Sequence, residues 1–174
     1  GGKFHSSPEV LIKRIRGLKA FIFDWDGVFN DGVKVDGNGS PFSEIDSMGL
    51  NMLRFSYYLK FDFIPSIYII TGENNQPAIQ LGRREHFSAV YLKAKNKTDT
   101  LNHIKAESAV KNSEIAFTFD DILDLGLAKE AEVGFFVNRE SSPLLNKYVA
   151  LNSLADYRTG AKSNSNPVRE ICEL

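Results

Sequence analysis

The chain has 174 residues, a formal net charge of -1 and one cysteine. Its hydrophobic content of 43% and charged content of 25% are ordinary for a globular domain with one substantial core. The near-neutral charge disfavours a nucleic-acid partner, because such domains usually carry a basic excess. No apolar stretch approaches membrane-spanning length, and Cys172 has no second cysteine to pair with. We therefore expect a cytoplasmic protein with no membrane partner.

The first expected element is a short helix in a lead-in segment, residues 1–17. Ser7 is a favourable N-cap, Pro8 suits the first helical position, and Glu9 places an acid in the first turn. Residues 18–174 show no internal repeat and no long linker. We therefore expect them to form one domain.

A short apolar run, from Phe21 to Phe23, stops abruptly at acidic residues and predicts a strand buried on both faces. Asp24 and Asp26 then stand at the carboxyl end of this strand, where open α/β sheets bind ligands. Side chains alternate along extended chain, so the two carboxylates point to the same side. Such a pair favours Mg²⁺, which takes oxygen ligands and is often shared with a substrate phosphate. The alternative is a solvated turn, because Asp and Gly27 are ordinary turn residues.

After the first strand, residues 33–35 and 42–45 flank a stretch rich in turn formers and predict a β-hairpin. Strands and helices then alternate along the chain. We expect strands at 64–70, 89–92, 115–119 and 133–137, helices at 50–59, 74–86, 97–106, 124–130 and 143–148, and a polar loop at 156–166 before a last helical turn. This alternation predicts a doubly wound, mainly parallel α/β sheet.

Polar side chains follow four of the predicted strands. They are Asp24 and Asp26, Thr71, the region of Lys97, and Asp120-Asp121 with Asp124. Because the carboxyl ends of parallel strands converge on one rim, these groups become neighbours. The set suits a phosphoryl group: the acids hold Mg²⁺, Lys97 supplies a fixed positive charge, and Thr71 with nearby backbone N–H groups supplies donors. A carboxylate nucleophile there gives an aspartyl-phosphate that water later attacks.

The order Asp-x-Asp-Gly, Thr-Gly, Lys, Asp-Asp-x-x-Asp resembles the haloacid dehalogenase (HAD) superfamily of phosphatases over nearly the whole chain from Leu18. Residues 24–32 (Asp-Trp-Asp-Gly-Val-Phe-Asn-Asp-Gly) and 46–50 (Asp-Ser-Met-Gly-Leu) look like the branch that contains 3-deoxy-D-manno-octulosonate 8-phosphate (KDO 8-P) phosphatase and nonulosonate 9-phosphate phosphatases. Residues 168–173 are similar to that branch's closing Val-Arg-Glu segment. The resemblance implies a Rossmann-like core with the hairpin insertion but without a cap domain, and Mg²⁺-dependent hydrolysis of a small phosphorylated sugar acid. It also implies a homotetramer whose hairpins close neighbouring sites.

The resemblance also implies residue roles. Asp24 becomes the nucleophile and a metal ligand, while Asp26 protonates the leaving alcohol and then activates water, with its backbone carbonyl on the metal. Thr71 and Lys97 bind phosphoryl oxygens. The metal site is completed by Asp120 and supported by Asp121 and Asp124.

For the substrate, the resemblance points to side chains around the Thr-Gly motif. Glu73 follows Gly72 where the octulosonate enzymes tend to carry Arg, and an acid there is more like the nonulosonate enzymes. Hydroxyls on a longer sugar tail can hydrogen-bond that carboxylate. Arg84 is a candidate for binding the substrate's own carboxylate, and Asn30 replaces the branch's Thr.

Three departures from the branch involve glycine. Phe119, Lys93 and the stretch 161–167 stand where the branch carries Gly, and we expect a reshaped rim because Gly permits positive φ or close backbone approach. Two other functions remain open. One is a phospho-acceptor signalling domain of the response-regulator kind, which also combines acids, a Thr and a Lys. The other is a catalytically weak HAD-like binding or oligomerisation module linked to sugar-nucleotide metabolism, which would bind metal with negligible turnover.

Overall fold

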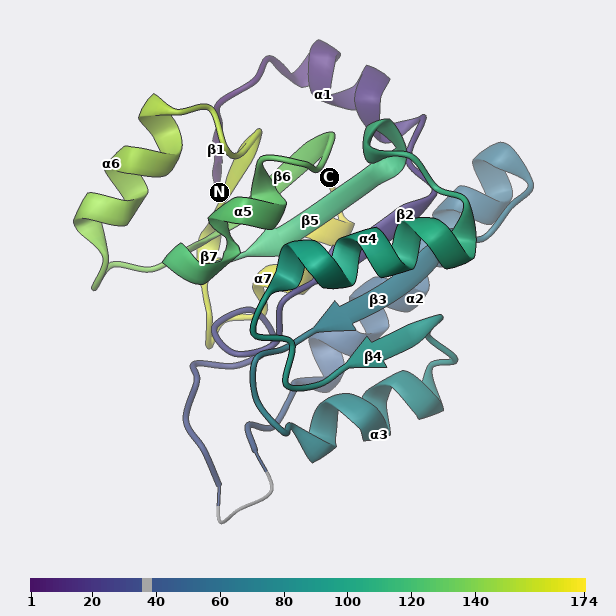
Figure 1. The fold of residues 1–174 in the computed structure, drawn as a ribbon. Helices are drawn as coiled ribbons and strands as arrows, with labels where there is room; N and C mark the ends of the chain where they lie inside the picture. Colours follow the sequence, from purple (N-terminus) through teal and green to yellow (C-terminus); the bar gives the residue numbers. More distant parts are fainter. Residues whose placement is uncertain (36–38) are drawn as a thin grey trace.

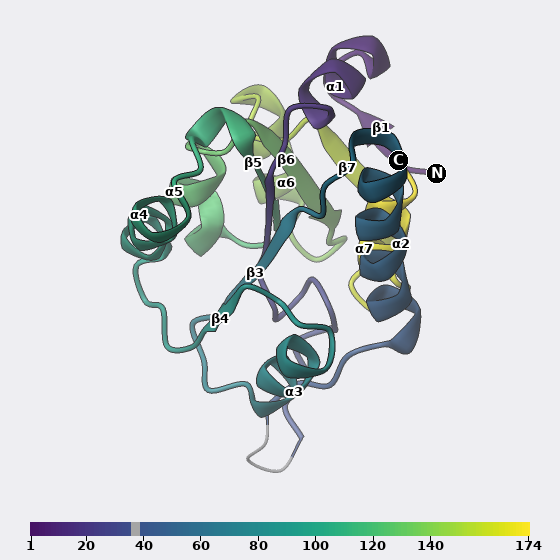
Figure 2. The ribbon, with the colours of Figure 1, turned by 90° about the vertical axis from the view of Figure 1, so that its right-hand side faces the viewer.

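The structure, a computed structural model, describes residues 1–35 and 39–174. A seven-stranded sheet carries helices on both faces (Figures 1 and 2). The strands are β1 (Lys3–Phe4), β2 (Ala20–Phe23), β3 (Ser66–Ile70), β4 (Ala89–Tyr91), β5 (Ile115–Phe119), β6 (Val133–Asn138) and β7 (Tyr157–Lys162). The helices are α1 (Pro8–Ile15), α2 (Glu44–Phe61), α3 (Gln76–Arg84), α4 (Lys97–Ser108), α5 (Leu125–Ala128), α6 (Pro143–Leu151) and α7 (Pro167–Cys172), with short 3-10 helices η1 (Asn112–Glu114) and η2 (Ile122–Asp124). None of the described helices combines the length and apolar composition needed to cross a membrane.

The strand order is β1-β7-β6-β5-β2-β3-β4, and every neighbouring pair is parallel except β1 with β7. β2 lies inside the sheet, where Phe23 pairs with Ile69 of β3 and with Thr118 of β5. The predicted doubly wound, mainly parallel sheet is therefore confirmed, and the described residues contain no cap domain. The acids that follow β2 leave the sheet next to the ends of β3 and β5.

Side chains of β2 alternate between two buried clusters, one on each face of the sheet. Phe21 and Phe23 belong to the cluster that includes Leu50 of α2 and Val168 of α7. Ile22 belongs to the cluster that includes Leu101 of α4. Figure 2 shows the two helical layers edge-on, with α2 and α7 on one side of the sheet and α4 and α5 on the other. Burial on both faces explains why β2 reads as a continuous apolar run.

A helix–helix contact joins two of the segments on which the resemblance rests. Asp46 of α2 is buried, and its Oδ1 accepts a hydrogen bond from the Arg169 backbone N–H of α7 (2.8 Å). Burial raises the pKa of Asp46 to about 6, although the N–H groups of Arg169 and Val168 oppose the shift. A Cβ on Gly49 would lie 3.0 Å from Arg169 Cα. Residues 46–50 and 168–173 thus dock the C-terminal helix on α2.

The arms of the predicted β-hairpin are loop rather than strand. Residues 33–35 and 39–43 form no strand, and Glu44 already begins α2; the hairpin tip, residues 36–38, lies outside the described residues. One backbone hydrogen bond, from Val35 N to Gly39 O (3.0 Å), joins the arms. Val33 and Val35 are half-exposed, and a lone two-stranded ribbon without a covering layer is marginally stable. We call residues 31–43 the β2–α2 loop.

Two strands were missed by sequence reasoning. β7 lies within the predicted polar loop at 156–166, because its sequence lacks an apolar run, and β1 is a two-residue edge strand paired antiparallel to it. Buried Asp156 anchors this region: it accepts hydrogen bonds from Ser6 Oγ (2.5 Å), Arg14 Nη1 (2.8 Å) and the Gly134 N–H (3.0 Å). The lead-in segment is therefore tied to the sheet.

Candidate active site

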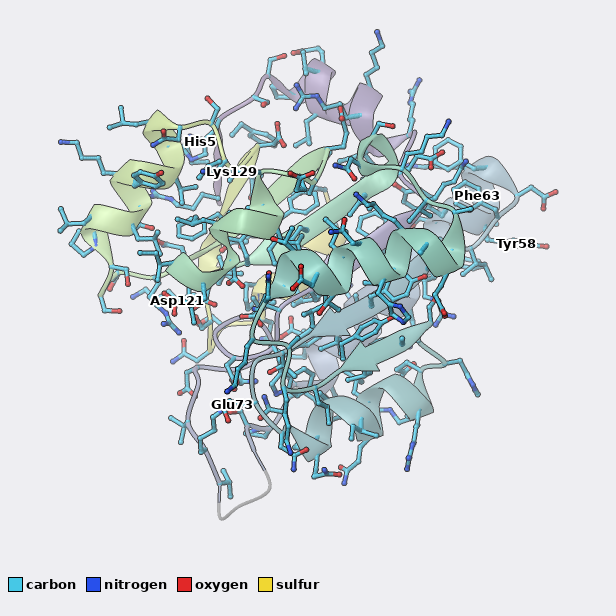
Figure 3. All side chains as sticks on the ribbon, viewed as in Figure 1. His5, Tyr58, Phe63, Glu73, Asp121 and Lys129 are labelled. Atoms are coloured by element: carbon cyan, nitrogen blue, oxygen red, sulfur yellow. The ribbon has the colours of Figure 1, made fainter. Side chains whose placement is uncertain are left out.

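A cavity of about 550 Å³ lies at the carboxyl ends of the parallel strands. Its lining contains nearly all of the residues that the sequence analysis singled out, namely Asp24, Asp26, Thr71, Gly72, Glu73, Lys97, Asp120, Asp121 and Asp124. In Figure 3, Glu73 and Asp121 lie at this edge of the sheet, on the loops that follow β3 and β5. The predicted convergence of distant motifs on one rim is thus present in the structure.

Three acids surround one buried lysine at the base of this cavity. Oxygens of Asp24, Asp120 and Asp124 all lie within 4.8 Å of one another, and all three residues are buried. Lys97 Nζ donates to Asp24 Oδ1 (2.6 Å) and to Asp124 Oδ1. Burial, followed by the charge of Asp124, raises the pKa of Asp24 to about 7 despite the opposing Lys97. Burial, followed by the charge of Asp24, raises the pKa of Asp120 to about 8.

The acid cluster fits a divalent cation on its own chemistry. Neither oxygen of Asp120 accepts a hydrogen bond, although Nη2 of Arg139 lies 2.9 Å from Oδ2, because that contact lacks hydrogen-bond geometry. Buried carboxylate oxygens without hydrogen bonds are costly, and a bound cation removes the cost. Three carboxylates at close range match the oxygen ligands that Mg²⁺ prefers.

The turn after β2 brings the chain against Asp120. Gly27 adopts φ +86°, and a Cβ at this position would lie 2.0 Å from Asp120 Oδ2. Trp25 is fully buried and donates from Nε1 to the Ser40 carbonyl (3.1 Å), which ties the turn to the β2–α2 loop. The glycine is therefore required both by the backbone conformation and by the approach of a candidate metal ligand.

Asp26 is held by three hydrogen-bond donors. Its Oδ1 accepts from Ser40 Oγ (2.6 Å), and its Oδ2 accepts from Lys34 Nζ (2.6 Å) and from Asn75 Nδ2 (2.9 Å). Burial acts to raise the pKa of Asp26, but these donors outweigh it and hold the pKa below its usual value. The carboxylate is therefore ionised in the structure.

Thr71 is buried where the chain turns from β3 toward α3. Its Oγ1 accepts hydrogen bonds from Asn75 Nδ2 (2.9 Å) and from the Glu73 N–H (3.4 Å). Asn75 therefore joins Thr71 to Asp26 through a single amide. Sequence reasoning treated Asn75 only as part of the start of a helix, although its position four residues after Thr71 placed it at the same rim.

Three predicted site residues make contacts outside the acid cluster in the structure. The Arg84 guanidinium binds Glu44 (2.6 Å) and Glu85 (2.8 Å) and does not line the cavity. Asn30 is buried and bonds the backbone of its own turn, at Trp25 O and Gly32 N, so it is not in the cavity lining either. Asp121 lines the cavity, but its Oδ1 accepts from the Ile122 N–H (2.6 Å) and it lies outside the close acid group.

The two single-residue glycine replacements behave differently. Lys93 adopts φ +54°, a conformation that glycine takes without strain, so the backbone keeps the glycine-like shape at some energetic cost. Phe119 is fully buried and stacks against Phe117 with ring centroids 5.5 Å apart. The expected reshaping of the rim is thus absent from the backbone at Lys93, and the Phe119 side chain packs into the core rather than onto the cavity.

Arg139 is a cavity residue that sequence reasoning missed. It directly follows β6 (Val133–Asn138), a strand that was predicted, and its neighbours in the sequence form no recognisable motif. The one clue in the sequence was that Arg139 follows a predicted strand, because the carboxyl end of β6 meets the same rim as those of β2 and β5.

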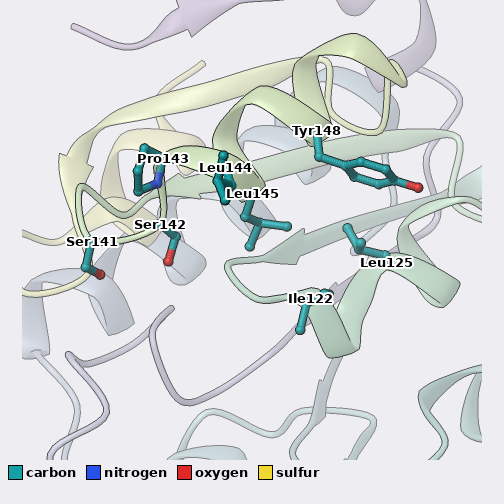
Figure 4. A pocket seen from close by; sticks show the side chains of 8 residues that line it. All are labelled: Ile122, Leu125, Ser141, Ser142, Pro143, Leu144, Leu145 and Tyr148. Atoms are coloured by element: carbon teal, nitrogen blue, oxygen red, sulfur yellow. The ribbon is translucent and has the colours of Figure 1, made fainter.

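A second cavity, of about 730 Å³, lies elsewhere on the molecule (Figure 4). Its lining is mostly apolar, with Ile122, Leu125, Leu144 and Leu145 among the side chains, and it contains no acid and no base. Phosphoryl chemistry needs charged groups, so the acidic cavity is the candidate active site.

No protein-family model matches the chain, and no curated protein matches it significantly. Among solved structures, it is similar to the KDO 8-P phosphatase of Yersinia pestis, with 25% identity over 93% of this chain and 82% of that one and a TM-score of 0.77. The enzyme of Moraxella catarrhalis, solved with magnesium, phosphate and KDO, gives 23% identity, 96% and 90% coverage and a TM-score of 0.77. The cobalt-bound enzyme of Haemophilus influenzae gives 19% identity, 92% and 88% coverage and a TM-score of 0.74.

The fold and the acidic site together define a phosphatase of the HAD class, with Mg²⁺ as the cofactor that the site fits. Within that class, the chain is similar to the KDO 8-P phosphatases, which confirms the resemblance inferred from its motifs.

Proposed function

We propose that this chain hydrolyses the phosphate monoester of a small sugar acid, of the KDO 8-phosphate or nonulosonate 9-phosphate type, through a covalent intermediate on Asp24. The observation that carries the proposal is the meeting of Asp24, Asp120 and Asp124 around buried Lys97 in an open cavity. Carboxylates with one fixed cation suit a reaction whose difficulty is the charge of the transferred group.

In the first step, an Asp24 oxygen forms a bond to phosphorus while the bond from phosphorus to the ester oxygen breaks. Asp26 gives its proton to that leaving oxygen. In the second step, water attacks phosphorus, Asp26 takes the water proton, and the Asp24–phosphorus bond breaks to release phosphate. Mg²⁺, when bound by Asp24 and Asp120, neutralises charge on the phosphoryl group. General acid–base work of the kind given to Asp26 typically contributes about 10² to 10⁴-fold.

For this cycle, Asp26 must exchange donors. Lys34 and Asn75 now hold Oδ2, and the low pKa that results opposes protonation. Lys34 is half-exposed on the β2–α2 loop, so it is the donor that can leave most easily. We propose that the proton enters at Oδ2 after Lys34 has moved away, while Ser40 and Asn75 keep the carboxylate oriented.

A sugar acid is the proposed substrate for two reasons. Structural neighbours are KDO 8-P phosphatases, one of them solved with KDO, magnesium and phosphate. Glu73 lies at the cavity, where its carboxylate can accept hydrogen bonds from sugar hydroxyls. The homotetramer, the cytoplasmic location and the division into residues 1–17 and 18–174 stay predictions.

The test is a turnover assay with p-nitrophenyl phosphate and with phosphorylated eight- and nine-carbon keto acids, each with and without Mg²⁺. We expect Mg²⁺-dependent hydrolysis, with a keto acid as the better substrate, and loss of turnover in Asp24→Asn. The matched control is Asp31→Asn, which removes a carboxylate from the same cavity outside the acid group.

Each failure has its own meaning. Mg²⁺ binding with no hydrolysis of any ester would establish the catalytically weak module instead. Stable self-phosphorylation without turnover would indicate the signalling domain. Turnover of the aryl ester alone would refute the sugar-acid substrate while leaving the phosphatase in place.

A further inference from the structure

Arg139 lies beside Asp120, the one acid of the Asp24, Asp120 and Asp124 cluster that receives no hydrogen bond from Lys97. Its Nη2 lies 2.9 Å from Oδ2 of Asp120, while Lys97 donates to the other two acids, Asp24 and Asp124. The Arg139 side chain is 30% exposed, whereas that of Asp120 is 1% exposed, so the guanidinium reaches in from the cavity wall.

The cavity has more negative than positive side chains, so a positive charge on Arg139 would help it to bind an anion. Among the described residues, seven acids and three bases line the cavity, and the bases are Lys95, Lys97 and Arg139. A phosphate monoester is a dianion and is repelled by this surplus of acids. Lys97 is already engaged by two carboxylates, so a second cation near the acid group must come from the cavity wall.

The contact between Arg139 and Asp120 is close but poorly directed. Both oxygens of Asp120 lack a hydrogen bond, so the guanidinium neutralises charge without the paired geometry that an arginine usually makes with a carboxylate. Asp120 is also a member of the group that fits Mg²⁺. A divalent cation and a guanidinium beside the same oxygens repel each other.

We propose that Arg139 is a substrate-binding residue that rests against Asp120 until a divalent cation binds there, and then offers its guanidinium to the phosphoryl oxygens of the substrate. This inference rests on the proposed function. Arginine suits the second task because its planar fork matches phosphate oxygens bidentately. Metal and phosphate binding are thereby coupled through one side chain.

The proposal requires effects of opposite sign on two binding steps. Without phosphate, Arg139 competes with Mg²⁺, so Arg139→Met should bind Mg²⁺ about fivefold more tightly, the size expected for a partly exposed ion pair. With Mg²⁺ saturating, Arg139→Met should bind inorganic phosphate about tenfold more weakly, because a charge-assisted pair is lost. Arg139→Lys should lie between Arg139→Met and wild type in both steps.

The experiment is isothermal titration calorimetry on the full chain, first with MgCl₂ alone and then with inorganic phosphate at saturating Mg²⁺. The matched control is Lys95→Met, which removes a cation from the same cavity without a contact to Asp120 among those described. Its Mg²⁺ affinity should change less than that of Arg139→Met. Thermal melting of each variant checks that it is folded.

An unchanged or weaker Mg²⁺ affinity in Arg139→Met overturns the proposal, because Arg139 would then only position Asp120. An unchanged phosphate affinity overturns it as well. Neither readout needs turnover, so the two failures can be told apart. The two signed shifts in a chain that hydrolyses no ester would refute the proposed function, and would show only that Arg139 couples metal binding to phosphate binding.

Discussion

Replacing Lys97 with methionine tests the electrostatic core of the site. Lys97 is 9% exposed at its side chain and pairs with Asp24 and Asp124, whose side chains are 9% and 0% exposed. Methionine keeps much of the volume and removes the charge. The variant is left with two buried carboxylates that have lost their shared cation, beside a third at Asp120.

The size of the effect follows from this burial. Removing one partner of a buried ion pair typically costs about 3–5 kcal/mol, because the remaining charge is uncompensated. Protonation limits this cost. Neutralising a carboxylate costs about 1.4 kcal/mol for each unit by which the ambient pH exceeds its pKa. We expect the free energy of unfolding to fall by about 3 kcal/mol at about pH 8, and by clearly less at about pH 5.5. For a chain of this length, 3 kcal/mol corresponds to a fall in Tm of roughly 6–12 °C.

The assay is urea unfolding of the metal-free protein at the two pH values, monitored by circular dichroism. Lys95→Met is the control, because Lys95 is exposed and lies two residues away. Adding Asp124→Asn to Lys97→Met should recover part of the loss, since it removes one of the stranded charges. If Lys97→Met were as stable as wild type near pH 8, the acids would not depend on Lys97 and the reasoning would be wrong.

Four further predictions concern the same site. Gly27→Ala should weaken Mg²⁺ binding at least tenfold by calorimetry, because its Cβ would lie 2.0 Å from Asp120 Oδ2; unchanged binding would show that the turn adapts. The raised pKa values of Asp24 and Asp120, about 7 and about 8, make the folded metal-free protein hold more protons than the unfolded chain, so its Tm should fall as pH rises from about 4 to 8. Mg²⁺ should therefore raise Tm more at about pH 8 than at about pH 5.5, and an equal rise would contradict these shifts. Lys34→Met should raise the pKa of Asp26 and move the alkaline limb of the kcat profile to higher pH, because Asp26 must be protonated to act as the acid, whereas an unmoved profile would exclude Lys34 from the cycle.

The central part of the fold could be predicted from the sequence because its strands are buried on both faces. β2, β3, β5 and β6 are nearly all apolar, so their runs of hydrophobic residues stand out, and each ends at a polar residue that marks the rim. The edge of the sheet carries no such signal. β7 has no run of apolar residues, since only Tyr157 and Thr159 of its six residues are buried, and β1 has two exposed residues. Their pairing depends on tertiary contacts such as those of Asp156.

The site residues also divide into those that the sequence predicts and those that depend on tertiary contacts. Asp24, Asp120 and Asp124 come together because motif spacing and strand order place them there, and both can be read from the sequence. Arg139 lines the cavity and Lys34 contacts Asp26, which lines it; both side chains come from loops without a motif, and their partners are set by the geometry of neighbouring loops.

The position of β2 also separates the acids of the cavity from the β1 margin of the sheet. A strand lies on each side of β2, and the outermost strands, β1 and β4, do not touch it. Lengthening, fraying or replacing β1 therefore leaves the acidic rim unmoved, whereas β4 bonds the Thr71 N–H through the Tyr91 carbonyl (2.9 Å) and leads into the segment that carries Lys97. This architecture lets the β1 edge acquire new contacts, such as an added strand from another polypeptide, without disturbing the acids of the cavity.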